Sequence, residues 1–135
     1  MNLHSVNWLA ALVAALTGFV VGGLWYGPLF KKPWMRLTGM TKEKGAQANV
    51  PLTFGGAYVL NLIGALGLDT VAGDQHVGAL CGALIGALAA ASLVATALGV
   101  IHLFEQRPLR LWLINAGYQV VNFAAMGAVL GAWAR

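Results

Sequence analysis

The sequence predicts an all-α, polytopic membrane protein that forms one domain over residues 1–135 and has four transmembrane helices. Hydrophobic residues make up 59% of the chain and charged residues only 9%. The charged residues fall in short clusters and leave four uncharged stretches, at residues 5–30, 45–68, 77–104 and 111–134. Crossing an apolar bilayer core takes about 20 helical residues, so each stretch is long enough to span it.

The expected spans cover residues 6–27, 51–69, 77–103 and 111–133. Pro28 should end the first span and, together with Pro33, keep the chain from continuing as regular helix into the loop. The second span is barely long enough and is expected to be short, tilted or broken, because it contains Gly55, Gly56, Gly64 and Gly67. The third is longer than a perpendicular crossing needs, so it should tilt or extend along the interface. The loop from Lys31 to Asn49 has the composition of a segment that lies on an anionic leaflet.

The basic residues predict the orientation of the chain. Seven of the eight follow the first or the third span, namely Lys31, Lys32, Arg36, Lys42, Lys44, Arg107 and Arg110. Arg135 ends the chain, whereas the second connection carries Asp69 and Asp74 and no basic residue. The positive-inside rule then places both termini outside the cytoplasm, with the protein in the inner (plasma) membrane. The rings near the span ends are expected to anchor at the headgroup level: Trp8, Trp25, Tyr26, Trp34, Trp112 and Trp133.

Small residues predict where helices pack closely. The third span reads Gly78, Gly82, Gly86 and Ala90 in steps of four, and the first span carries Gly18 and Gly22. In lipid, helices associate through close backbone approach and interhelical hydrogen bonds. These faces, together with Gly127 and Gly131 of the fourth span, are therefore expected to support packing, either with a second copy of the chain or with another membrane protein.

The fourth span carries a stripe of polar side chains. On a 3.6-residue helix, Asn115, Tyr118, Gln119 and Asn122 fall within one arc of about 100°. The small residues of the span lie opposite: Gly117, Ala124, Gly127, Ala128 and Gly131. Neither face suits bulk lipid, so this helix should lie inside a bundle or an oligomer.

An internal similarity favours two repeated helix hairpins of the same orientation. Leu29-Phe30 before Pro33 resembles Leu103-Phe104 before Pro108. The run from Ala57 to Asn61 likewise resembles the run from Gly117 to Asn122, with one gap. A repeat of this kind would bring Tyr58 and Asn61 to face the polar stripe of the fourth span.

Several strings of residues resemble one known family. They are Val6-Asn7-Trp8-Leu9, the run from Leu24 to Phe30 with Trp34-Met35, Leu103-Phe104-Glu105 with Arg107-Pro108, Ile114-Asn115-Ala116-Gly117-Tyr118 and Met126-Gly127. The chain resembles, nearly end to end, the bacterial family known as domain of unknown function 1761. The resemblance implies a small four-span membrane protein, and it implies no activity, cofactor or catalytic residue.

The sequence offers little chemistry of other kinds. His4 and His76 are expected on one side of the membrane and His102 near the other, so the three histidines do not form one metal site. The carboxylates lie at loops or span ends and form no acid–base pair: Glu43, Asp69, Asp74 and Glu105. No phosphate-binding loop, Cys-x-x-Cys pair or basic helix face is present. We therefore expect neither an enzyme nor a nucleic-acid-binding protein, and no metal or cofactor.

Two classes of function remain open. The polar stripe, with Tyr58 and Asn61, could line a cavity or pore, which makes the protein a small oligomeric channel or transporter-like protein for a neutral or weakly polar solute. The same side chains could instead only hydrogen-bond neighbouring helices. The protein would then be a structural or accessory subunit that docks a partner through its small-residue faces.

Overall fold

The computed structural model describes residues 8–41, 43–44, 49–72 and 78–133, and every regular element within them is helical. The elements are α1 (Trp8–Leu24), η2 (Trp25–Leu29), α2 (Lys31–Thr38), α4 (Val50–Ala72), α5 (Ala79–Ala89), η3 (Ala90–Val94), α6 (Ala95–Phe104) and α7 (Leu109–Ala132). Four stretches are long and apolar enough to cross a membrane, so the fold-class prediction is confirmed: Trp8–Leu29, Val50–Val71, Ala79–Phe104 and Leu109–Ala132. Residues invoked above that lie outside the described part are His4, Val6, Asn7, Lys42, Asp74, His76 and Arg135.

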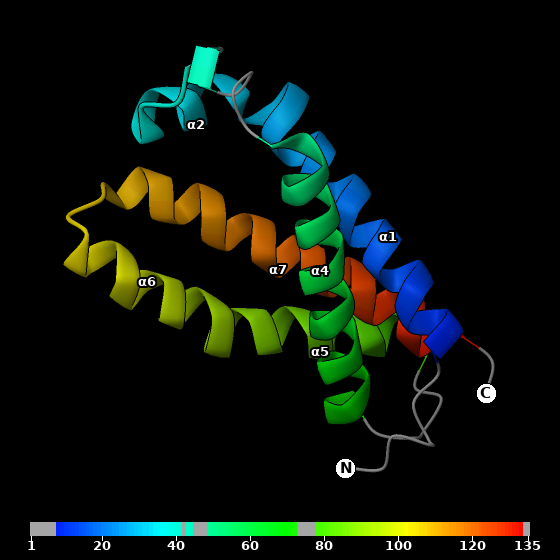
Figure 1. Ribbon diagram of the computed structural model, residues 1–135. Coiled ribbons are helices and arrows are strands. Elements are labelled where there is room, and N and C mark those ends of the chain that lie inside the picture. Colours follow the sequence, from blue (N-terminus) through cyan, green and yellow to red (C-terminus); the bar gives the residue numbers. More distant parts are fainter. Residues whose placement is uncertain (1–7, 42, 45–48, 73–77, 134–135) are drawn as a thin grey trace.

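The helices pack as two pairs that cross (Figure 1). In one pair α5, η3 and α6 form a long helix beside α7, and in the other α1 packs against α4. α1 also packs along α7, which joins the two pairs. α7 thus contacts its own partner helix and both helices of the other pair, and it is the central helix of the fold. Two packed hairpins are what the predicted repeat requires, but the equivalence of the hairpins stays a prediction.

The contact between α5 and α7 consists of backbone against backbone. A Cβ atom built on Gly82 would overlap the carbonyl oxygen of Gly127, and one built on Gly127 would overlap that of Gly82. Gly86 lies in the same way against the Phe123 carbonyl, and Gly131 against Gly78. The Gly78 amide also donates a hydrogen bond of 2.9 Å to the Gly131 carbonyl oxygen. The glycine faces of the third and fourth spans are thus in contact within one chain, and neither is left free for a second copy.

The third span contains a π-helical turn, η3, which the sequence analysis did not anticipate. Buried residues follow steps of four through Gly82, Gly86 and Ala90, and the next one is Ala95, five residues on. A four-residue step drifts about 40° round an α-helix. The wider π turn accommodates one extra residue. The buried face of α6 therefore still points to α7, although the row of buried residues in α5 has rotated round the helix axis.

The prediction that Pro28 ends the first span at residue 27 is wrong. The α-helix ends at Leu24 and continues as the π-helical turn η2, which contains Pro28. Its closing bond runs from the Phe30 amide to the Trp25 carbonyl oxygen, 2.9 Å. A proline ring clashes with the carbonyl four residues earlier in an α-helix, and the wider π turn relieves that clash.

The loop after the first span contains the short helix α2, which is separated from η2 by the non-helical residue Phe30. Pro33 is the third residue of α2. The amides of the first turn have no acceptor within their helix, so a proline at this position removes no bond. Gly39 ends α2 with a φ of 75°, a conformation that favours glycine.

The second span is also longer and more regular than expected. α4 runs unbroken for 23 residues. Asp69, assigned to the following loop, lies in its last turns and is 3% exposed. The glycines of α4 do not interrupt it because all its amide-to-carbonyl bonds can still form, and Gly64 gives room to the Phe123 ring of α7.

Candidate functional site: a pocket between α1, α2, α4 and α7

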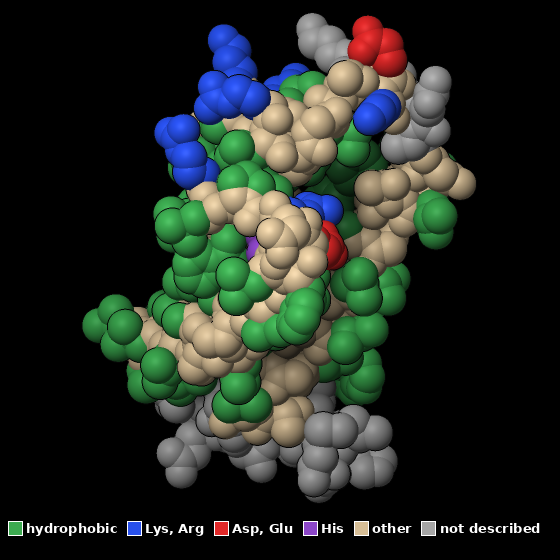
Figure 2. All heavy atoms as spheres, turned by 90° about the vertical axis from the view of Figure 1, so that its left-hand side faces the viewer, with side chains coloured by type: hydrophobic (Ala, Val, Ile, Leu, Met, Phe, Trp, Pro, Cys, Tyr) green, Lys and Arg blue, Asp and Glu red, His purple; other side chains and the backbone are tan. Residues whose placement is uncertain are grey.

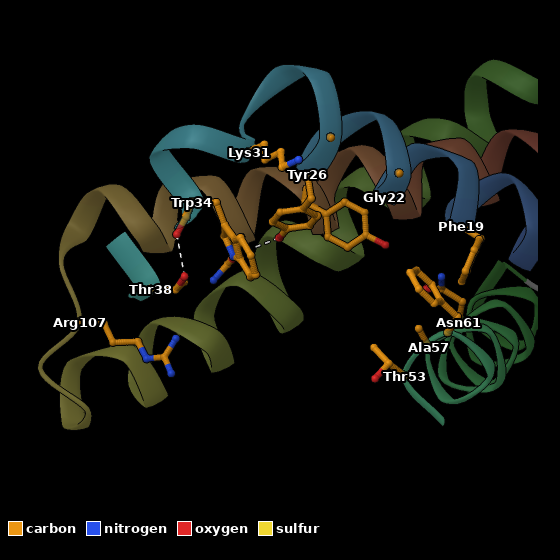
Figure 3. A pocket seen from close by; sticks show the side chains of 15 residues that line it. Phe19, Gly22, Tyr26, Lys31, Trp34, Thr38, Thr53, Ala57, Asn61 and Arg107 are labelled. Atoms are coloured by element: carbon orange, nitrogen blue, oxygen red, sulfur yellow. Dashed lines mark hydrogen bonds between the residues drawn. The ribbon is translucent and has the colours of Figure 1, made fainter. Parts of the chain in front are cut away.

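A pocket of about 800 Å³ lies where α1 and η2 meet α2, α4 and α7. Its lining comes from all of these helices and from the turn before α7: Phe19, Gly22, Gly23, Tyr26, Gly27, Lys31, Trp34, Thr38, Thr53, Phe54, Ala57, Asn61, Arg107, Asn115 and Tyr118. Figure 3 shows Thr38 and Arg107 at one end of it and Phe19, Ala57 and Asn61 at the other, with Tyr26 between them. The volume falls within the usual range of small-molecule sites, about 300–1,000 Å³.

Aromatic rings form the walls of the pocket. Tyr26 lies edge-on to Tyr118 and to Trp34, with ring centroids 5.2 and 5.6 Å apart. At the other end Phe19 lies edge-on to Phe54 at 5.8 Å. Rings in edge-to-face contact are attractive and stiff, so they can hold helices apart without collapsing into the space between them.

The π-helical turn η2 positions Tyr26. The Tyr26 hydroxyl donates a hydrogen bond of 2.8 Å to Asn115 Oδ1. Next to it, Trp25 Nε1 donates to the Ile114 carbonyl oxygen at 3.0 Å, so two adjacent rings fasten the end of the first span to α7. A second indole, that of Trp112, donates from Nε1 to the Ala95 carbonyl oxygen at 2.9 Å, just after η3. The polar groups of these three side chains thus bind neighbouring helices, and their predicted place at the membrane interface stays a prediction.

Of the six side chains predicted to form a polar cavity, three line the pocket: Asn61, Asn115 and Tyr118. Asn122 is completely buried, and its Nδ2 donates to Asn61 Oδ1 at 3.2 Å and to Gln119 Oε1 at 3.4 Å. Asn122 Oδ1 points at Gly18, where a Cβ atom would overlap it. Asn122 and Gln119 therefore hold helices together beyond the Asn61 end of the pocket.

Tyr58 does not face the polar stripe of α7. Its hydroxyl donates a hydrogen bond of 3.0 Å to the Leu12 carbonyl oxygen, and its ring packs edge-on to Phe19 at 6.4 Å. Tyr58 therefore binds α1, whereas Asn61, three residues on, reaches Asn122 of α7. Gly22 of α1 does face the stripe: a Cβ atom on it would lie 3.2 Å from the Tyr118 hydroxyl oxygen.

Basic side chains gather at one end of the molecule (Figure 2), around the α2 segment and the turn between α6 and α7. Two of them, Lys31 and Arg107, line the pocket, and none of its described lining residues is acidic. Arg107 Nε lies 2.6 Å from Glu105 Oε2, in a half-exposed ion pair. Lys31 has no ion pair with any of the described residues. The described lining of the pocket therefore carries positive charge and no negative charge.

Sequence reasoning missed the aromatic walls, although a signal for them exists. Phe19, Gly22, Gly23 and Tyr26 follow the spacing i, i+3, i+4, i+7, which places them on one face of the first span. Thr53, Ala57 and Asn61 follow the same face of the second span in steps of four. From the sequence, Gly22 was assigned to helix packing and Tyr26 to the membrane interface. The face that they share with Phe19 was therefore not predicted to line a pocket.

The fold and the site together define a helical multi-pass membrane protein with a ring-walled pocket inside one chain. Residues 9–131 match the family described as "Protein of unknown function (DUF1761)", and the chain belongs to that family. The resemblance seen in the sequence is thereby confirmed. No curated protein and no solved structure matches the chain.

Proposed function

We propose that the protein is a transporter-like membrane protein that holds a small, weakly polar lipophile in the pocket between α1, α2, α4 and α7. The observation that carries the proposal is the pocket itself: about 800 Å³, walled by rings and carrying the amide and hydroxyl groups of Asn61, Asn115 and Tyr118. A few polar groups placed in a largely apolar concavity are typical of small-molecule sites. The pocket lies within one chain, so this role needs no second copy to complete the site.

A carrier fits this geometry better than an open pore. Beyond Asn61 the packing is tight, since Asn122 and Met126 are both completely buried and Asn122 is bonded to Asn61. A pore would need an aqueous path past these side chains. A solute that enters from the end with Thr38 and Arg107 (Figure 3) would instead stop at the tight packing beyond Asn61 and leave only after the helices rearrange.

The accessory role through glycine faces has weaker support, because Gly82, Gly86, Gly127 and Gly131 are already in contact within the chain. A partner would have to use another surface. α4 offers the largest one, since most of its side chains are exposed in the isolated chain, but lipid covers such a surface equally well.

A cysteine in the pocket tests the proposal. In a Cys81→Ser background, Ala57→Cys should react with a charged, water-soluble thiol reagent, because Ala57 lines the pocket. Leu60→Cys is the matched control, since Leu60 is on the same helix, 70% exposed and outside the pocket lining. A thiol in lipid does not ionise and should not react. For a carrier, the reagent should reach Ala57→Cys from one side of the membrane in any one state; reaction from both sides indicates a channel.

Filling the pocket provides the second arm of this experiment. A Cβ atom at Gly23, which lines the pocket, would meet nothing within 4 Å, and the same holds at Gly67 outside it. Gly23→Leu should slow the reaction at Ala57→Cys several-fold, and Gly67→Leu should leave it unchanged. Equal rates at Ala57→Cys and Leu60→Cys, or no effect of Gly23→Leu, would contradict the proposed pocket.

The orientation belongs to the same proposal, and it follows from the seven basic residues after the first and third spans. Single cysteines at Lys42 and Gln75, again without Cys81, should label oppositely with an impermeant reagent in intact cells. Position 75 should label from outside and position 42 only after the cells are opened. Labelling of position 42 in intact cells would reverse the orientation and place the entrance of the pocket outside.

A further inference from the structure

A second, smaller pocket lies between α6 and α7, close to the turn that joins them. Its volume is about 260 Å³, and it is lined by Gly99, His102, Leu103, Arg107, Leu109 and Trp112. Of these residues only Arg107 also lines the larger pocket. Leu103 and Leu109 are 75% and 68% exposed in the isolated chain, so the pocket opens on the apolar surface that lipid covers in a membrane. A ligand can therefore reach it from the bilayer.

His102 is the unusual member of this lining, because its side chain is buried and unpaired. It lies in the last turn of α6 and is 6% exposed, and its Nδ1 atom is completely buried without a hydrogen-bond partner. No described residue binds its Nε2 atom either. A histidine ring always has at least one N–H donor, and buried polar groups are normally paired. Because Nδ1 is enclosed and Nε2 is not, Nε2 is the ring atom that a ligand in the pocket can reach.

The other polar side chains of the lining already have partners. Arg107 Nε lies 2.6 Å from Glu105 Oε2, so its charge needs no anion from the pocket. Trp112 Nε1 donates to the Ala95 carbonyl oxygen at 2.9 Å, and the indole offers the pocket an apolar face. Gly99 gives that ring room, since a Cβ atom on it would lie 3.2 Å from Trp112 Nε1. The described lining therefore presents one unpaired hydrogen-bonding side chain among largely apolar surroundings.

From these observations we infer that the smaller pocket binds a neutral lipid through a single oxygen atom, which shares a hydrogen bond with His102 Nε2. A carbonyl oxygen accepts from an N–H group, and a hydroxyl can donate or accept, so either head suits an imidazole. Sites that enclose a whole small molecule usually measure about 300–1,000 Å³, and this pocket is smaller. The head and the nearest carbon atoms would fill it, and the rest of the chain would extend past Leu103 and Leu109 into the bilayer. This site does not depend on the proposed function of the larger pocket.

Nitrogen NMR of isotope-labelled histidine side chains tests the hydrogen bond directly. The full chain is placed in nanodiscs of ether-linked phosphatidylcholine, which has no ester carbonyl that could occupy the site. The pH is kept at about 9, where an ordinary imidazole is neutral. The probes are dodecanol and a methyl ketone of the same length, and dodecane is the control without an oxygen atom. The signals that disappear in His102→Phe belong to His102.

At least one of the two oxygen-containing probes should shift the Nε2 signal of His102 until the site is saturated, whereas dodecane should leave it in place. A shift with the ketone identifies Nε2 as the donor of the hydrogen bond. A shift with the alcohol alone identifies Nε2 as the acceptor. The two possible heads are thus told apart in one experiment.

Quenching of Trp112 fluorescence measures how tightly the head is held, because Trp112 lines the same pocket. A dodecanol with bromine next to its hydroxyl-bearing carbon should quench more than the bromoalkane of the same length, and the excess should vanish in Trp112→Phe. His102→Phe should weaken binding of the bromoalcohol about fivefold, since one hydrogen bond is lost, and His102→Gln should weaken it less. Thr96→Val is the matched control and should bind like the parent, because the Thr96 hydroxyl bonds the Ser92 carbonyl oxygen of its own helix and lies outside the pocket lining.

Three outcomes would overturn this site. Equal effects of the alcohol and the alkane would show a groove that holds any apolar chain. His102 signals that no probe shifts would show that Nε2 binds no such head. Tighter binding of dodecyl phosphate than of dodecanol would replace the neutral head by an anion at Arg107. None of these outcomes affects the reaction of Ala57→Cys, which tests the proposed function separately.

Discussion

α7 has two opposite surfaces, and its neighbours contact them in very different ways. On one side Gly127 and Gly131 touch the backbone of α5, so that no Cβ atom fits between the helices. On the other side Asn115 and Tyr118 face a pocket of about 800 Å³ that rings of α1, α2 and α4 hold open. Glycine thus allows two helices to pack backbone against backbone, whereas large rings that are held by hydrogen bonds keep neighbouring helices apart.

The largest effect should follow a substitution on the closed side. Gly82→Leu would drive a side chain into the Gly127 carbonyl, and backbone cannot move aside as a flexible side chain can. We expect a loss of about 3 kcal/mol or more in the free energy of unfolding, or failure to fold. Thermal unfolding in mild detergent measures the loss. Gly67→Leu, in open space on α4, should stay within about 0.5 kcal/mol of the parent, and equal behaviour of the two variants would contradict a closed interface.

An intermediate effect is expected just beyond the Asn61 end of the pocket, at the bond between Asn122 and Asn61. Asn122→Ala leaves the Asn61 amide without this partner and should cost about 1–3 kcal/mol of unfolding free energy. A double-mutant cycle with Asn61→Ala should give a coupling energy of about 0.5–1.5 kcal/mol, whatever the change in side-chain volume. Strictly additive losses would show that Asn122 acts by packing alone.

The smallest effect on stability should come from the open side. Tyr26→Phe removes the bond to Asn115 and keeps the ring that supports the pocket, so it should cost about 0.5–1.5 kcal/mol. Tyr58→Phe removes a similar bond, to the Leu12 carbonyl, outside the pocket. The two variants should lose similar stability, but only Tyr26→Phe should change the Trp34 emission and the reaction of Ala57→Cys. Identical pocket measurements in both would show that Tyr26 does not shape the pocket.

The side of α7 that packs against α5 could be predicted from the sequence far better than the side that faces the pocket. Steps of four from Gly78 to Ala90 and the small face of α7 depend only on helical periodicity. The pairing of these two faces within one chain could not be foreseen, because the same pattern suits a second copy. Periodicity also grouped Asn115 with Tyr118, which do line the pocket, but it could not separate them from the buried Asn122. Their difference depends on how closely α1 approaches α7, since Gly18 of α1 lies directly against the Asn122 side chain.

The turn η3 has a consequence for how this helix tolerates insertions and deletions. A single residue lost from a regular helix rotates everything beyond it by about 100°, which normally misplaces a whole packing face. Here the extra residue is confined to Ala90–Val94, with Gly82 and Gly86 seated before it and Ala95 and His102 buried after it. Losing one residue from η3 would therefore turn it into ordinary α-helix, restore the four-residue step between the buried residues, and leave both α5 and α6 facing α7. The third span can thus change its length by one residue at η3. The Ala95 carbonyl oxygen, which accepts the hydrogen bond from Trp112 Nε1, lies directly after that turn and is the contact closest to such a change.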